Sequence, residues 1–338
     1  MDAHRIAVIG TGYIGIEHIK VIAAHPRARL HTICATPRSE AAAGELMTTY
    51  GAERVRTRYE DVVEDPEVDA VYLCTPNSQH VGQAVAALDA GKHAFVEKPL
   101  AVTVADCRRI VDAACRSGRQ VMVGHGARFS NIFVTIQKLV ADGMLGDACF
   151  VEGDYVHDLG PFLDLPGHDW WMDTEKEGQL PVIGGACHPL DLMRWIAGEI
   201  VEVSAYGANR NIPQAPWYDT VIACLKFASG AVGKCLASCG AKIPYAMNFS
   251  YYGTKGSVVK NRLYLDGIPN VEDFMEMPIQ IRAEDHTCAL ELDHFLGCIE
   301  TGERPMIDAA DGARSVAVCC AVIESIQTGR PVAVDLDF

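Results

Sequence analysis

Short apolar runs alternate with longer amphipathic segments along the first third of the chain. The apolar runs lie at residues 5–10, 29–35, 70–75, 94–100 and 120–125. Near-continuous apolar runs are typical of parallel strands that are buried on both faces, and the second run is the least continuous, with Arg29, His31 and Thr32. The segments between the runs have the spacing of helices. The alternation predicts an α/β fold in which helices cover a doubly wound parallel sheet.

The pattern changes after residue 124, where strand-like runs with alternating apolar and polar positions become frequent. Helices are predicted at 131–145, 184–198, 288–301 and 312–328, and a last strand at 331–336. The strand-like runs lie at 149–157, 200–208, 220–227, 231–239, 247–252, 257–260 and 262–265. We therefore predict a first domain over residues 1–124 and a second over residues 125–338.

The first apolar run leads directly into a glycine-rich loop and then into a helical segment. The loop reads Gly10-Thr11-Gly12-Tyr13-Ile14-Gly15. In this setting the first glycine permits a tight turn, the second lets a pyrophosphate approach the backbone, and the third lets the helix pack on the strand. The loop predicts a dinucleotide site whose contacts include residues 10–14. The alternative is an ordinary tight turn between a strand and a helix.

The end of the second apolar run bears on the choice of cofactor. NAD sites usually carry an acid there, which binds the ribose 2′-hydroxyl. Residues 35–39 contain no acid, but they offer Thr36, Arg38 and Ser39 to a 2′-phosphate. This favours NADP over NAD, although Ser39 is also explained as the cap of the following helix.

The fourth apolar run ends abruptly in Glu97, Lys98 and Pro99. Proline restricts the residue before it to extended backbone, so Lys98 should be held firmly at the carboxyl end of a strand. Ligands of open α/β sheets bind at this edge, where the glycine-rich loop also lies. Lys98 is therefore a candidate site residue, and a surface ion pair with Glu97 is the alternative.

Composition narrows the class of protein. The 338 residues carry a net charge of −15, which argues against a nucleic-acid partner because phosphate binding needs a basic face. The 13 cysteines are scattered without zinc-type pairing, so we expect reduced thiols, no metal centre and a cytoplasmic protein. The first strand begins too early for a signal peptide, and no apolar run is long enough to span a membrane.

Five motifs follow one another along the chain in a specific order. They are Gly10-x-Gly12-x-x-Gly15, Thr75-Pro76-Asn77-x-x-His80, Glu97-Lys98-Pro99, Gly184-Gly185-x-x-His188-x-x-Asp191 and Tyr252-Gly253-Thr254-Lys255-Gly256-Ser257. In this combination the chain resembles the Gfo/Idh/MocA family, named after glucose–fructose oxidoreductase, inositol 2-dehydrogenase and the rhizopine-catabolism protein. The resemblance covers essentially the whole chain.

The resemblance implies a Rossmann domain followed by an α/β domain with a large, open, mostly antiparallel sheet. It places the active site between the domains, with Lys98 beside the nicotinamide and the reacting hydroxyl. It also implies homodimers or homotetramers formed through the large sheet. The residues that it assigns to the cofactor cleft are Thr75, Pro76, Asn77, His80, Glu97 and Arg128.

His188 and Asp191 lie three residues apart and share one face of a predicted helix. Such a pair is commonly structural, but the resemblance makes His188 a catalytic residue and lets Asp191 orient it or bind a substrate hydroxyl. Further candidates for substrate contacts are Tyr155, His157, Trp170 and Trp171. The two tryptophans lie in a predicted loop over 158–183, where they contact cofactor, sugar or another subunit, or else fill the core beneath the loop.

One position departs from the family pattern. Many of its dehydrogenases carry an aspartate four residues before the histidine, and this chain has Gly184 there. The third polar group of the site is therefore missing or comes from elsewhere, with Asp154, His157 and Asp169 as candidates.

The motifs together predict an NAD(P)-dependent oxidoreductase that acts on a secondary hydroxyl of a sugar, glycoside or polyol. Burial beside a positive nicotinamide would favour the uncharged amine of Lys98, which could then relay the proton. His188 would serve as the base or its partner. One alternative is a nicotinamide-dependent glycoside hydrolase that oxidises its substrate transiently. Another is a non-catalytic regulator that responds to sugar and dinucleotide.

Overall fold

The computed structural model describes residues 3–165, 168–267, 274–277 and 287–338. The chain folds into two compact units. The first unit comprises Met1–Gly126, His286–Ala313 and Phe338, and the second comprises Ala127–Asp285 and Arg314–Asp337. A segment from late in the sequence thus completes the amino-terminal unit, a contribution that the run of apolar strands does not indicate.

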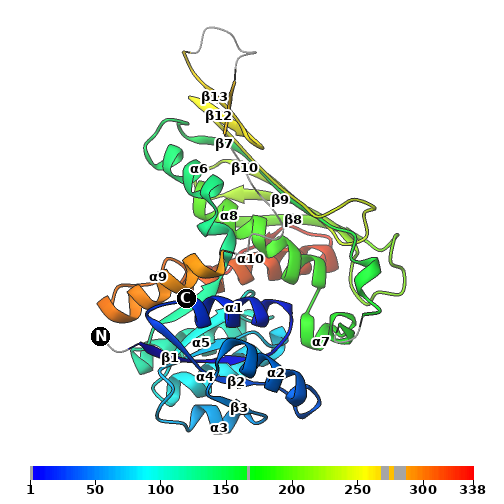
Figure 1. The fold of residues 1–338 in the computed structure, drawn as a ribbon. Coiled ribbons are helices and arrows are strands. Elements are labelled where there is room, and N and C mark those ends of the chain that lie inside the picture. Colours follow the sequence, from blue (N-terminus) through cyan, green and yellow to red (C-terminus); the bar gives the residue numbers. More distant parts are fainter. Residues whose placement is uncertain (1–2, 166–167, 268–273, 278–286) are drawn as a thin grey trace. The chain divides into compact units, whose positions relative to one another are not determined.

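The first unit is built on a six-stranded sheet with the order β3-β2-β1-β4-β5-β6, in which every pairing is parallel (Figure 1). The predicted doubly wound sheet is confirmed. The order reverses between β1 and β4, the place where such sheets bind ligands. The strands are β1 (His4–Ile9), β2 (Ala28–Cys34), β3 (Arg54–Arg56), β4 (Ala70–Leu73), β5 (His93–Glu97) and β6 (Val121–Gly124).

Helices cover both faces of this sheet. The connections from β1 to β2 and from β4 to β5 run in opposite directions across the sheet, and right-handed crossovers therefore place α1 and α4 on opposite faces. Helix α9, from the carboxy-terminal part of the chain, packs against α1. The helices are α1 (Tyr13–Ala24), α2 (Glu40–Tyr50), α3 (Tyr59–Val63), α4 (His80–Asp89), α5 (Val104–Ser117) and α9 (Cys288–Thr301).

A buried aromatic cluster joins the sheet to α1 and α9. The rings of Tyr72 on β4 and Phe95 on β5 stack with centroids 4.4 Å apart. His18 on α1 and Phe295 on α9 meet both rings edge-on. These contacts bury an imidazole in the core, where it needs a hydrogen-bond partner.

The second unit is built on a nine-stranded sheet with the order β14-β13-β12-β11-β7-β10-β9-β8-β15. Among the strands that the structure describes, only β7 and β10 pair in parallel, so the sheet is mostly antiparallel, as the family resemblance implies. The strands are β7 (Ala148–Val156), β8 (Ile200–Ala208), β9 (Thr220–Phe227), β10 (Val232–Ser238), β11 (Ala246–Gly253), β12 (Gly256–Val259), β13 (Arg262–Leu265), β14 (Met275–Glu276) and β15 (Val332–Ala333).

One face of the large sheet is covered by helices and the other is exposed. Helices α6 (Asn131–Ala141), α8 (Cys187–Ala197) and α10 (Ala309–Thr328) lie along the covered face (Figure 1). Side chains along β9 alternate between buried and exposed, the pattern of a sheet with one solvated face. On the exposed face Tyr206 lies opposite Ile222. The predicted homo-oligomer through this face stays a prediction.

The predicted loop over 158–183 contains short helices of its own. They are η4 (Gly160–Phe162), η5 (Asp169–Met172), α7 (Thr174–Glu177) and the π-helix η6 (Leu180–Ala186), which leads into α8. Trp217 anchors this segment, because its indole N–H donates to the carbonyl of Trp171 at 2.8 Å. Isolated π-helical turns are uncommon and are frequent at functional sites.

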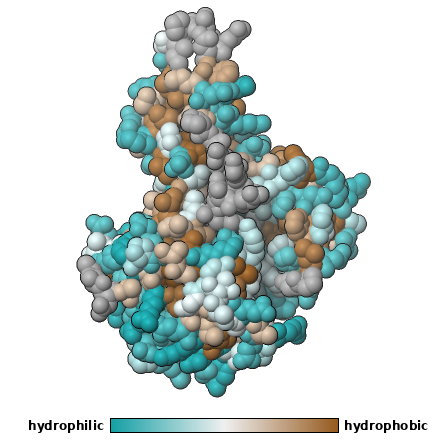
Figure 2. Space-filling model, viewed as in Figure 1, coloured by the Kyte–Doolittle hydropathy of each residue, from teal (hydrophilic) through white to brown (hydrophobic). Residues whose placement is uncertain are grey.

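The hydropathy of the surface, the cysteines and the helices can be compared with what the composition predicts. Hydrophilic residues predominate on the face shown in Figure 2, between smaller hydrophobic areas. The 13 cysteines all lie among the described residues and all are free thiols. In the described part of the chain, every helix is too short or too polar to cross a membrane.

Candidate active site

The glycine-rich loop joins β1 to α1 at the point where the sheet order reverses. Gly10 has a φ of +102° and a Cβ atom there would overlap the carbonyl oxygen of Cys74. A Cβ atom at Gly15 would overlap the carbonyl oxygen of Gly10. By contrast, a Cβ atom at Gly12 would meet nothing within 4 Å. Gly10 and Gly15 are thus required by packing, whereas Gly12 leaves open space at the amino end of α1, as pyrophosphate binding needs.

The loops after β4 and β5 meet at the same sheet edge through His80. Its Nδ1 lies 2.9 Å from the carbonyl oxygen of Pro99, and its Nε2 lies 3.0 Å from that of Thr75. Burial lowers the pKa of His80, although both backbone contacts oppose this shift. The imidazole therefore ties two predicted cofactor loops together. Asn77, another predicted cofactor residue, is also buried.

The loop after β2 presents the residues that were predicted to hold a 2′-phosphate. Arg38 is exposed in a short 3-10 turn, and Thr36 donates a hydrogen bond to the Ser39 hydroxyl at 3.3 Å. The first acid beyond Cys34 is Glu40, at the start of α2.

Glu97 is the last residue of β5 and its side chain is directed into the core. The residue is 7% exposed, and its Oε1 lies 2.7 Å from Nε2 of His18. Its Oε2 accepts the backbone N–H of Lys98 at 3.1 Å. Burial raises the pKa of Glu97, but the hydrogen bond with His18 and nearby positive charge outweigh burial, so the net shift is downward. An ionised carboxylate therefore supports the backbone of Lys98, which itself is half-buried.

A second buried carboxyl group, Glu291 on α9, lies close to Glu97. It is 3% exposed, and burial together with the charge of Glu97 raises its pKa well above the usual range. Thr287 secures the start of α9 by donating to the carbonyl of Gly126 at 2.6 Å. Sequence reasoning missed Glu291 because it lies almost two hundred residues from Glu97 and belongs to none of the motifs.

In the second unit, Arg128 and Asp191 form a buried ion pair. Two guanidinium nitrogens of Arg128 donate to the two oxygens of Asp191 at 2.8 and 2.7 Å. The Ser315 hydroxyl also donates to Asp191 at 2.7 Å, and it receives a bond from Arg194. Asp191 is 1% exposed and both its oxygens are engaged within this unit. The contacts predicted for Asp191 with substrate and for Arg128 with cofactor stay predictions.

The predicted substrate residues of this unit form an aromatic group around His188, the second residue of α8. The ring of Tyr155 stacks on His188 with centroids 6.0 Å apart and planes 11° apart. Tyr245 meets Tyr155 and His157 edge-on. Burial raises the pKa of Tyr155 and lowers that of His157. The structure thus gathers Tyr155, His157 and His188 in one place, and their contact with substrate stays a prediction.

The two neighbouring tryptophans belong to the short turn η5. Trp171 stacks on His168 at 4.2 Å and packs against a buried cluster that includes Trp217. Trp170 meets Trp171 edge-on at 6.2 Å. Trp171 therefore contributes to the packing beneath the segment, one of the alternatives left open by the sequence.

The space beside Gly184 is filled by an acid that the sequence did not indicate. A Cβ atom at Gly184 would lie 2.7 Å from Oε1 of Glu177. Glu177 is 2% exposed. Of the candidates named from the sequence, Asp154 lies 2.9 Å from the amine of Lys234, and Asp169 is exposed.

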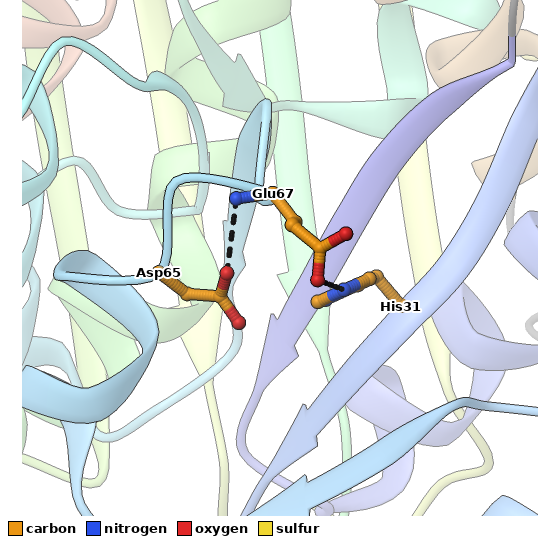
Figure 3. A group of neighbouring side chains, drawn as sticks. All are labelled: His31, Asp65 and Glu67. Carbon is orange, nitrogen blue, oxygen red and sulfur yellow. Dashed lines mark hydrogen bonds and ion pairs between the residues drawn. The ribbon is translucent and has the colours of Figure 1, made fainter.

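A group of His31, Asp65 and Glu67 in the first unit has potential ligand atoms within 4.8 Å of one another (Figure 3). Its carboxylates already pair with Arg54, which donates to Asp65 at 2.6 Å and also to Glu67. We assign the group to the ion pairs that join β2, β3 and the loop before β4.

Comparison with known proteins decides the family. Residues 4–125 match the Gfo/Idh/MocA model described as an oxidoreductase family with an NAD-binding Rossmann fold, and residues 133–259 match the model of its C-terminal domain. The chain belongs to the Gfo/Idh/MocA family. It is therefore an oxidoreductase, and the resemblance seen in the five motifs is confirmed.

Similar members of the Gfo/Idh/MocA family align over almost the whole chain. The scyllo-inositol 2-dehydrogenase (NAD(+)) of Bacillus subtilis (strain 168) is 27% identical, over 98% of this chain and 96% of that protein. The myo-inositol 2-dehydrogenase of Thermotoga maritima is 27% identical, over 97% and 98%. A solved structure of levoglucosan dehydrogenase with NADH and L-sorbose superposes with a TM-score of 0.91 at 25% identity, over 99% and 100% of the two chains.

The paired carboxyls predict how stability depends on pH. Glu291 keeps its proton in the folded protein, because burial and the charge of Glu97 raise its pKa, and it releases the proton on unfolding above pH ~4.3. Stability conferred by this group is therefore lost as pH rises, by about 1.4 kcal/mol per pH unit until its folded pKa is reached. Glu291→Gln should flatten this decline between pH 5 and 8, as measured by urea unfolding.

The exposed Glu45 provides the control for this experiment, since Glu45→Gln should leave the slope unchanged. Glu97 does not interfere, because its lowered pKa affects stability only as pH falls into the acid range. Parallel pH profiles for the wild-type protein and Glu291→Gln would show that Glu291 is ionised in the fold.

The buried ion pair predicts a second stability effect. Asp191→Asn preserves the shape of the side chain but removes the negative charge that faces the buried Arg128 guanidinium. We expect the free energy of unfolding to fall by about 3–5 kcal/mol. The double variant Arg128→Met/Asp191→Leu removes both charges and should recover most of that loss. Thermal unfolding would test this, and a double variant no more stable than Asp191→Asn would contradict it.

Proposed function

We propose that this protein is an NAD(P)-dependent dehydrogenase of a sugar or polyol, in which Lys98 and His188 handle the proton of a secondary hydroxyl. The proposal is carried by the position of Lys98 at the carboxyl end of β5, on the same sheet edge as the glycine-rich loop between β1 and α1. The names of the inositol and levoglucosan dehydrogenases among its relatives support this class of substrate.

The residues at this edge fit a dinucleotide. The open space beside Gly12 leaves room for a pyrophosphate at the amino end of α1. Backbone and side chains of Thr11, Tyr13 and Ile14 would line the same loop, with Thr75, Pro76, Asn77 and Lys98 farther along the edge. When bound, the nicotinamide supplies the hydride acceptor.

The chain's own groups would handle the proton. As the substrate carbon gives up a hydride, its hydroxyl must lose a proton, and the amine of Lys98 is proposed to accept or relay it. The Glu97 carboxylate holds the backbone N–H of Lys98 and so fixes where the side chain begins. His188 is proposed to act on the same hydroxyl as base or partner. Asp191 is proposed to act indirectly, by holding Arg128 in place.

We further propose NADP as the preferred cofactor. The support is the absence of an acid from residues 35–39, together with the exposed guanidinium of Arg38 beside the hydroxyls of Thr36 and Ser39. One relative is named for NAD(+) and one solved relative holds NADH, so this preference would be a difference between members of the family.

Lys98→Met tests the proton-handling role directly. We expect turnover to fall by about 10²–10⁴-fold, the usual contribution of a positioned acid or base, while cofactor affinity measured by fluorescence titration stays near wild type. Lys138→Met, which removes an exposed lysine on α6, is the matched control. Near-normal turnover in Lys98→Met would remove this residue from the mechanism.

The assay should pair sugars, polyols and glycosides with both cofactors and follow reduced cofactor and bond cleavage together. A dehydrogenase forms reduced cofactor in proportion to its product. Cleavage of a glycoside with no net reduced cofactor would instead identify a redox-assisted glycoside hydrolase.

Arg38→Leu tests the preference for NADP. Loss of a charge-assisted hydrogen bond to the 2′-phosphate should weaken NADP binding by about tenfold or more, with NAD binding almost unchanged. Calorimetric titration of both cofactors into both proteins measures the difference. An equal effect on the two cofactors, or tighter binding of NAD by the wild-type protein, would reject NADP preference.

A further inference from the structure

Gly184 occupies a position where any side chain would collide with a carboxylate. The contact is with Oε1 of Glu177, 2.7 Å from where the Cβ atom would be, and Leu180 lies next to it at 3.0 Å. The glycine therefore makes room for an acid that comes from seven residues earlier in the chain. Glu177 is buried, and a carboxylate is buried only where hydrogen bonds or nearby charges offset the cost of removing it from water.

The local fold directs Glu177 to this place. Asp173 caps α7 by accepting the backbone N–H of Glu175 at 3.0 Å. Helix α7 ends at Glu177, and Gly178 turns the backbone with a φ of +77°. The π-helix η6 then carries Gly184 back beneath the Glu177 side chain. Lys176 on the same short helix pairs with Asp173 rather than with Glu177.

Tyr155 links the surroundings of this carboxylate to the predicted base, His188. Gly184 and Gly185 belong to the π-helix η6, which leads directly into α8, the helix that carries His188. The ring of Tyr155 would lie 2.8 Å from a Cβ atom at Gly185, and it stacks on His188. The pKa of Tyr155 is raised by burial and, among smaller causes, by the charge of Glu177.

We propose that Glu177 supplies the acidic group of the substrate site in place of a residue at position 184, acting as a positioning residue that stabilises the protonated imidazole of His188. This inference rests on the proposed dehydrogenase function. In the oxidation, the substrate O–H bond would break and its proton would pass, directly or through Lys98, to His188, while the C–H bond would break with its electron pair; a bound nicotinamide would supply the acceptor for that hydride. The carbonyl forms, and the Glu177 carboxylate offsets the positive charge on the imidazole.

The first test removes the charge of Glu177 and keeps the shape of its side chain. Glu177→Gln should lower kcat by at least about tenfold, the loss that about 1.4 kcal/mol of stabilisation accounts for. A carboxylate near the imidazole favours its protonated form. Its loss should therefore move the acid limb of the kcat/KM profile to lower pH. Glu175→Gln, which changes an exposed acid on the same helix, should change neither quantity.

The second test moves the acid to position 184. Glu177→Ala removes the carboxylate and vacates its space, and the double variant Glu177→Ala/Gly184→Asp places a new carboxylate on η6. We expect the double variant to recover most of the kcat lost in Glu177→Ala. If Glu177 only filled space, an acid placed at position 184 would not restore its role. Failure of the double variant to recover kcat, with both variants shown to be folded by circular dichroism, would contradict the inference.

A third measurement does not depend on turnover. Histidine ring resonances of the protein can be followed with pH by NMR, with the His188 signal assigned by its loss in His188→Gln. The midpoint for His188 should fall in Glu177→Gln and stay unchanged in Glu175→Gln. If it falls while no sugar or polyol is oxidised, the link between Glu177 and His188 stands and the proposed function fails. If sugars are oxidised but the midpoint does not move, the inference about Glu177 is wrong.

Discussion

The hydrogen bond between His18 and Glu97 joins the carboxyl end of β5 to α1, and the charge states of the core beside it depend on this bond. It keeps one carboxylate ionised in a core that also contains a second carboxyl group, and the second group must then carry a proton. The other oxygen of Glu97 accepts the backbone N–H of Lys98. The same carboxylate therefore binds His18 in the core and positions the backbone of Lys98 at the end of β5. The aromatic rings around His18 exclude water from this bond and so make it strong.

The parallel sheet was predictable from sequence because most of its longer strands contain a short, near-continuous apolar run. The exception, β3, has only three half-buried residues, too few to produce a pattern. The glycine-rich loop was predictable for a similar reason, since its chemistry is contained in six consecutive residues. Local signals of this kind survive in a single sequence.

The residues that the sequence did not reveal are those brought together by packing over long separations. Glu291 reaches the vicinity of Glu97 through α9, a segment that completes the first unit from the far end of the chain. The ion pair of Asp191 with Arg128 joins residues that are 63 positions apart. Glu177 is close in sequence to Gly184, but a four-residue helix and a π-helical turn set the direction of its side chain. Neither element is long or regular enough to produce a periodic pattern in the sequence.

The three glycines of the nucleotide loop differ in whether their substitution would affect folding or only ligand binding. Gly10 and Gly15 lie against backbone atoms, so a substitution at either position is a folding defect and would appear in any screen for stability. Gly12 faces open space, so a methyl group there would not collide with the folded chain and would obstruct only a ligand. A test of folding alone would therefore not distinguish glycine from alanine at position 12, and only a measurement of ligand binding would show the difference.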